Sequence, residues 1–152
     1  MTEPNIALLR KSGEYLIALT RLGDDNQWWA TTATGKPFRF TKQQVVCETD
    51  LAVGANDFPD WLDSVERIAE EINLKETWKV VLGEVPGLSL TDLAGLIWVS
   101  PIDDVQIGAL LLCLYRPGLN YFKVAGATFT TLSEEEVATQ INHRIRLSLK
   151  HI

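Results

Sequence analysis

The period of the hydrophobic pattern changes once along the 152-residue chain, close to residue 50. Before that point, short apolar stretches separated by turn residues are typical of β-strands. After "DLAVGAND" (residues 50–57), apolar residues recur at helical spacing, as in Trp61, Leu62, Val65, Ile68 and Ile72. This change predicts an α+β protein with two domains, residues 1–50 and residues 57–152.

The first domain contains five stretches that favour strands, separated by tight turns. They cover residues 5–11, 14–22, 28–34, 37–41 and 45–49. Ser12 and Gly13 form the first turn, and "TKQQ" (residues 41–44) favours a single helical turn before the fifth strand. Five short strands in about fifty residues predict a small SH3-like β-barrel, because closure of a barrel removes exposed sheet edges.

The second domain is mostly helical and contains one hairpin. Helices are predicted over residues 57–74, 75–84, 89–98, 100–115 and 133–152, and a hairpin over 120–132 that turns at Ala125-Gly126. Ser89 and Ser133 begin capping boxes, while Ser100 and Pro101 are expected to cap and open the fourth helix. A short break between two helices, followed by a hairpin, predicts a winged-helix domain with a C-terminal helix.

Charge and composition exclude several classes of protein. The net charge is −6, and residues 47–114 hold most of the acid, with three Lys/Arg against thirteen Asp/Glu. That balance is unlike an autonomous nucleic-acid binder, so any RNA contact needs a local patch and is sensitive to salt. No apolar run reaches the ~18 residues of a membrane span, and we see no signal peptide. Cys47 and Cys113 fit buried thiols, so we expect a cytoplasmic protein without a membrane partner.

No set of residues has the spacing of an active site, so we expect no catalytic residue, metal site or cofactor in this chain. There is no phosphate-binding glycine loop, and the two histidines lie on one helix without acidic or cysteine partners. The second helix of the winged helix begins with Asp103 and Asp104 and is apolar along its length. Such a helix repels phosphates, so we expect no sequence-specific binding of duplex DNA.

The adjacent Trp28 and Trp29 are the most informative pair in the first domain. Because successive strand residues point to opposite faces, one should lie in the core and the other on or near the surface. An exposed aromatic ring among basic residues can stack on single-stranded bases. The candidate RNA-binding residues are Trp28, Trp29, Lys36, Arg39 and Lys42. The alternative, in which both tryptophans are structural, remains open.

The order of these segments resembles the N-terminal region of RNase II/RNase R-type 3′→5′ exoribonucleases, in particular their cyanobacterial and plastid branch. The resemblance spans residues 5–140 and rests on "QWWATT", "KQQV", "TWKVVL", "LTDLAGLIWVS" and "YFKV". It implies a parent enzyme that degrades single-stranded RNA with Mg²⁺, which aspartates of a central catalytic domain hold. None of those aspartates can be placed on this chain.

The resemblance therefore implies a non-catalytic module that guides or gates single-stranded RNA. Its partner would be a nuclease catalytic domain, in cis or on another protein, and its location would be the plastid stroma if the protein is organellar. The alternative is a stand-alone protein-interaction adaptor that uses the winged helix as a docking surface. The reading frame beyond Ile152 would distinguish the two.

Overall fold

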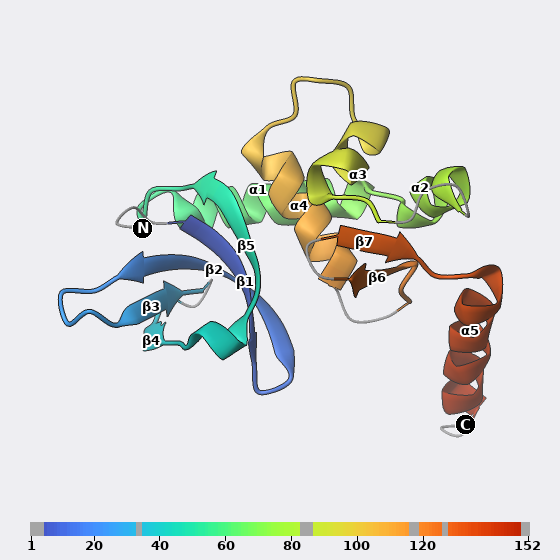
Figure 1. Ribbon diagram of the computed structural model, residues 1–152, viewed down its shortest axis with the longest axis horizontal. Helices are drawn as coiled ribbons and strands as arrows, with labels where there is room; N and C mark the ends of the chain where they lie inside the picture. The colour runs from blue at the N-terminus through green and yellow to red at the C-terminus, as the bar shows by residue number, and fades with distance from the viewer. Residues whose placement is uncertain (1–4, 33–34, 83–86, 116–118, 126–127, 150–152) are drawn as a thin grey trace.

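The computed structural model describes residues 5–32, 35–82, 87–115, 119–125 and 128–149. A five-stranded antiparallel sheet lies at one end of the molecule, helices fill the centre, and a hairpin and a final helix lie at the other end (Figure 1). The α+β class is confirmed.

The strands of the sheet are β1 (Asn5–Lys11), β2 (Glu14–Leu22), β3 (Trp28–Thr31), β4 (Pro37–Arg39) and β5 (Val45–Ala52), with a 3₁₀ turn, η1 (Lys42–Gln44), before β5. The later elements are α1 (Phe58–Glu71), α2 (Leu74–Val81), α3 (Leu90–Ile97), α4 (Asp104–Tyr115), β6 (Phe122–Ala125), β7 (Thr128–Thr131) and α5 (Glu134–Leu149).

The sheet is open, which corrects the expectation of a closed barrel. Its strand order is β4-β3-β2-β1-β5, and no ladder joins β4 to β5 among the described residues. β4 has only three residues and begins with Pro37, which has no N–H to donate to a neighbouring strand. Register shifts between β1 and β5 bend this edge of the sheet, so that it curls without its end strands pairing.

Both faces of β1 and β2 are covered. On one face, Ile6, Leu8, Ile17 and Leu19 pack with residues of α1 and α4. On the other face, smaller residues are covered by the curled sheet itself, namely Ala7, Leu9, Ala18 and Ala30, with Phe38, Phe40 and Val45 packed against them. The middle of each strand is consequently a run of four buried residues, as in a strand that lies between two layers.

Helix α4 is the central helix of the fold. Ala109 and Leu111 belong to the core shared with the sheet and α1, whereas Leu110 belongs to the core shared with α2, α3 and the hairpin. Figure 1 shows α4 between the sheet and the β6–β7 hairpin. Because α4 packs against both cores, it is buried on opposite sides, and this explains why the segment has no polar face.

The hairpin is attached to the helices at two points. Leu88, just before α3, exchanges two backbone hydrogen bonds with Phe129 of β7, at 2.7 and 2.8 Å. The indole N–H of Trp78 in α2 donates to the carbonyl oxygen of Leu132 at 2.7 Å. The hairpin turn expected at Ala125-Gly126 lies partly outside the described residues.

The predicted capping boxes at Ser89 and Ser133 are confirmed, but the start of α4 differs from the expectation. Asp103 and Gln106 form a reciprocal pair, in which each backbone N–H donates to the other side chain at 2.8 and 2.9 Å. The helix therefore begins after Asp103, three residues later than a Ser100 cap would place it. The acidic residue thus stabilises the helix N-terminus.

Tyr115, at the end of α4, connects the two parts of the molecule. Its ring lies 5.2 Å from that of Tyr15 in β2 and 6.1 Å from that of Phe129 in β7, between ring centroids. The hydrophobic core is thus continuous across the composition boundary near residue 50. The division into two domains remains a prediction.

The close approach of α1 to α4 gives a first prediction. A Cβ on Gly108 would lie 2.8 Å from the Trp61 ring, whereas a Cβ on Gly95 in α3 would meet nothing within 4 Å. Gly95→Ala should raise the free energy of unfolding by up to ~1 kcal/mol through helix propensity. Gly108→Ala should lower it, because overpacking costs about 1–3 kcal/mol and outweighs that gain. Urea denaturation of both variants measures the difference, and stabilisation by Gly108→Ala would contradict the packing described.

The environment of Tyr115 gives a second prediction. Burial raises the pKa of its hydroxyl to about 12, and Cys47 and Tyr15 add to the effect. An unfolded tyrosine ionises near pH ~10. The stabilising contribution of neutral Tyr115 is therefore fully present below that pH and is lost as pH rises toward the folded value. Spectrophotometric titration of tyrosinate should show a late step that disappears in Tyr115→Phe, and an unchanged late step would refute the assignment.

Candidate functional site

The candidate RNA-binding residues are divided between the two faces of the sheet, as the alternation of strand side chains requires. Trp28 and Lys42 line one cavity on the concave face. Trp29 and Arg39 lie together on the outer face, where they are direct partners in the β3–β4 ladder. The prediction that the tryptophans occupy opposite faces is confirmed. Both are half-buried, so neither is a fully buried core residue.

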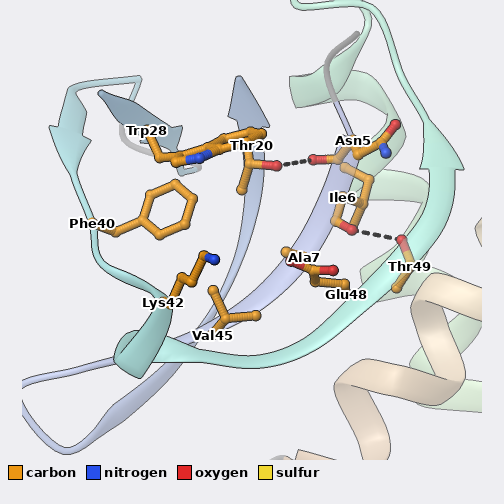
Figure 2. Close-up of a pocket in the computed structure, with 10 residues that line it drawn as sticks. All are labelled: Asn5, Ile6, Ala7, Thr20, Trp28, Phe40, Lys42, Val45, Glu48 and Thr49. Atoms are coloured by element: carbon orange, nitrogen blue, oxygen red, sulfur yellow. Dashed lines mark hydrogen bonds between the residues drawn. The ribbon is translucent and has the colours of Figure 1, made fainter. Parts of the chain in front are cut away.

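The cavity on the concave face has a volume of about 90 Å³. Figure 2 shows the Trp28 and Phe40 rings along one side of it, and the Lys42 side chain reaching toward it. The two ring centroids are 6.3 Å apart and the planes are tilted by 49°. Val45 and Ala7 supply further apolar surface. The cavity therefore offers aromatic surface next to a cation.

Two threonines fix the backbone on the β1 side of the cavity. The Thr20 hydroxyl donates to the Asn5 carbonyl oxygen at 2.9 Å, and the Thr49 hydroxyl donates to the Ile6 carbonyl oxygen at 2.6 Å (Figure 2). These bonds join β2 and β5 to β1 from both sides. The wall of the cavity is thus already formed without a ligand, which reduces the ordering cost of binding.

Lys42 is positioned by η1. The Thr41 backbone N–H donates to the Gln44 side-chain oxygen, and the Gln44 N–H donates to the Thr41 carbonyl oxygen, both at 3.0 Å. This turn places Lys42 at the rim, where it is exposed. Glu48 lines the same rim, and no ion pair joins the two charges among the described residues. Both charged groups are therefore available to a ligand.

Trp29 is already engaged on the outer face. Its indole N–H donates to Asp25 Oδ1 at 3.3 Å, and the Arg39 guanidinium lies 5.9 Å from the ring centroid. Hydrogen bonds from the Gln27 backbone N–H and the Trp29 indole lower the pKa of Asp25, so the carboxylate stays ionised as an acceptor. Trp29 is thus a less accessible stacking surface than Trp28.

Lys36 is exposed in the turn before β4, and in the described part of the chain no ion pair or ring contact connects it to either group. The structure thus brings Trp28 together with Lys42 and Trp29 together with Arg39, and leaves Lys36 apart from both pairs.

Sequence reasoning missed two residues of the cavity. Neither Phe40 nor Glu48 was among the binding residues predicted from the sequence. Glu48 lies opposite Ala7 because of the bulged β1–β5 register. The alternation of Phe38 and Phe40 with Arg39 would have placed Phe40 on the face of Trp28, once the β3–β4 register was known.

Within the described part of the chain, no cluster of His, Cys, Asp or Glu is placed to hold a metal ion. Over the same residues, no helix has the length and apolarity needed to cross a membrane. Comparison with known proteins found no match: no family model fits the chain, and no curated protein or solved structure is significantly similar to it. The resemblance to RNase II/R-type enzymes therefore stays a prediction.

The two tryptophans should differ in their contribution to stability. Trp28→Ala removes packing against Phe40 and should cost about 1–3 kcal/mol, less than the ~3–5 kcal/mol of a fully buried tryptophan. Trp29→Ala removes exposed contacts and should cost less than ~1 kcal/mol. Chemical denaturation monitored by circular dichroism measures both values. Equal losses would show that the outer ring is as tightly packed as the inner one.

Proposed function

We propose that this chain is a non-catalytic module that holds single-stranded RNA at the concave face of its sheet. The observation that carries the proposal is the convergence of Trp28, Phe40 and Lys42 on one open cavity. Aromatic rings stack on bases of any sequence, and a neighbouring ammonium attracts the phosphate backbone. Trp29, Arg39 and Lys36 would assist from the outer face and the adjoining turn.

The parent protein that fits this proposal is an RNase II/R-type exoribonuclease, whose N-terminal module guides or gates RNA. The Mg²⁺-dependent catalytic domain would then be its partner, in cis or on another chain, in the cytoplasm or the plastid stroma. The support is the order of the segments named above and the concentration of acidic residues in the helical part of the chain: residues 57–114 hold eleven of the twenty Asp/Glu, and none of those that the structure describes lines the cavity.

Two finer features of the fold support the proposal. Strands β1 to β4 form a meander, β5 pairs with the other edge of β1, and a 3₁₀ turn precedes β5. This strand order supports the assignment of the first part as an SH3-like barrel. The order α2, Leu88, α3, α4, β6, β7, with Leu88 paired to β7, supports the assignment of this part as a winged helix. We infer that the first part is an opened SH3-like barrel and the second a winged helix used as scaffold.

The winged helix in this proposal does not read duplex DNA. The helix that would enter the major groove is α4, whose residues Gly108 to Leu111 are buried. Its N-terminus carries exposed Asp103 and Asp104, which repel phosphates.

Binding of a labelled single-stranded RNA oligomer, measured by fluorescence anisotropy at several salt concentrations, tests the proposal. Trp28→Ala should weaken binding by about 1–3 kcal/mol. Lys42→Ala should weaken it and reduce the salt slope by about 0.7, the value expected for one lost phosphate contact on a single strand.

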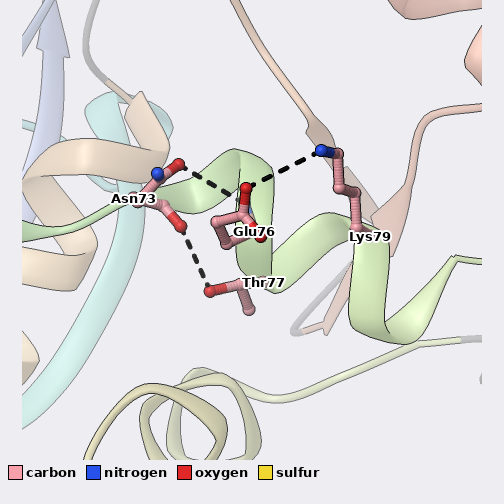
Figure 3. A network of polar contacts seen from close by, with 4 residues as sticks. All are labelled: Asn73, Glu76, Thr77 and Lys79. Atoms are coloured by element: carbon pink, nitrogen blue, oxygen red, sulfur yellow. Dashed lines mark hydrogen bonds and ion pairs between the residues drawn. The ribbon is translucent and has the colours of Figure 1, made fainter.

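Lys79→Ala is the matched control. Lys79 lies on α2, where its ammonium is 3.7 Å from the Glu76 carboxylate, within a small network around Asn73 (Figure 3). The variant loses the same charge as Lys42→Ala and should bind RNA like the wild type. The proposal is wrong if RNA does not bind at low salt, or if both lysine variants weaken binding equally.

One observation favours the second candidate, a protein-interaction adaptor. Leu96 and Val99, at and after the C-terminal end of α3, are 47% and 90% exposed. Exposed apolar side chains in one short segment are common at protein contacts. Failure of RNA binding in the titration above would leave this candidate as the better one.

A further inference from the structure

The polar groups of the cavity include both hydrogen-bond donors and acceptors. The Thr20 and Thr49 hydroxyl hydrogens are already donated to backbone carbonyl oxygens, so these hydroxyls can only accept from a ligand. Glu48 is also an acceptor, whereas the Lys42 ammonium and the Trp28 indole N–H are donors in the same lining. Asn5 completes the polar lining and already interacts with another group of the protein. A complementary ligand therefore presents a donor to Glu48 and acceptors to Lys42 or Trp28.

The aromatic geometry limits how a flat ligand can enter. Because the Trp28 and Phe40 planes are tilted by 49° with centroids 6.3 Å apart, they cannot sandwich a ring between parallel faces. A planar ligand would instead stack on one ring and place its edge against the other. Its polar edge would then face the rim that carries Lys42 and Glu48.

The volume limits the size of the ligand. A cavity of about 90 Å³ is well below the about 300–1,000 Å³ of pockets for drug-sized ligands, which favours a single-ring base over a fused pair. Together with the Glu48 carboxylate, which needs a donor, this favours a pyrimidine with an exocyclic amino group. Cytosine has an amino donor beside ring and carbonyl acceptors, whereas uracil presents two carbonyl oxygens around a single N–H.

We propose that the cavity binds one cytosine of a single-stranded RNA, in preference to uracil. The amino group donates to the Glu48 carboxylate, the contact by which acidic side chains recognise cytosine. Lys42 donates to an acceptor of the base or to its adjacent phosphate. This inference rests on the proposed function and adds base selection to it, with Glu48 as the residue that determines specificity.

Oligocytidine and oligouridine of equal length, titrated against the whole chain by fluorescence anisotropy, test the inference. The wild type should bind oligocytidine roughly 5- to 10-fold more tightly, the lower range for a good base contact. Glu48→Gln should bring the ratio close to one, because an amide also donates to the carbonyl oxygens of uracil. Trp28→Ala should weaken both oligomers by about 5-fold or more.

Asp50→Asn is the matched control. Asp50 lies on the same strand and its loss changes net charge equally, but it does not line this cavity. It should leave the cytosine-to-uracil ratio unchanged. Competition by cytidine monophosphate, but not uridine monophosphate, would show that base recognition needs no neighbouring nucleotides. Failure of both monophosphates to compete would contradict a preformed base site.

The outcomes separate this inference from the proposed function. RNA binding with equal affinity for both oligomers, or a preference that Glu48→Gln leaves intact, overturns the base site but not the RNA-holding module. Absence of binding to either oligomer at low salt overturns both. Circular dichroism confirms that Glu48→Gln is folded, and the ratio in the wild type alone decides the matter if it is not.

Discussion

The fold depends on the burial of β1 and β2 on both faces. Ile6 and Leu8 face α1 and α4, while Ala7 and Leu9 face the curled sheet. The small residues Ala7, Ala18 and Ala30 let β3, β4 and β5 come close on the concave face, and the large ones fill the wider gap to the helices. If the pattern were shifted by one residue, large side chains would occupy the concave face and no cavity would remain there.

The sequence predicted the features that depend on local rules. The α+β class, the five strands, the capping boxes at Ser89 and Ser133 and the opposite faces of Trp28 and Trp29 all follow from periodicity or side-chain chemistry within a few residues. The start of α4, where two residues can cap the helix, was predicted wrongly. Both Ser100 and Asp103 can cap a helix, and the sequence does not show which one the backbone presents to the first turn.

Long-range register explains the remaining errors. Closure of the barrel required β4 and β5 to pair, but Pro37 and the shortness of β4 leave that edge open. Glu48 reaches the cavity only because two register shifts in the β1–β5 ladder place it opposite Ala7. No pattern of alternation along β5 reports those shifts, since a bulge changes the face of every residue beyond it. The sequence indicated Trp28 and Lys42 as binding residues, but not the carboxylate beside them.

The distribution of charge is consistent with RNA held at the sheet rather than along the helices. The exposed face of α1 carries acidic side chains, among them Asp60, Asp63, Glu66 and Glu70, and these repel a phosphate backbone. The cation that lines the cavity, Lys42, belongs to η1, on the sheet rather than on the acidic helix. Glu48 is the exception, an acidic group beside the aromatic rings. Near phosphates its negative charge would weaken RNA binding, and only contact with a donor on the base would compensate for that repulsion. In the proposed module, an acidic residue at this position would therefore reduce affinity for RNA in general and increase selectivity between bases.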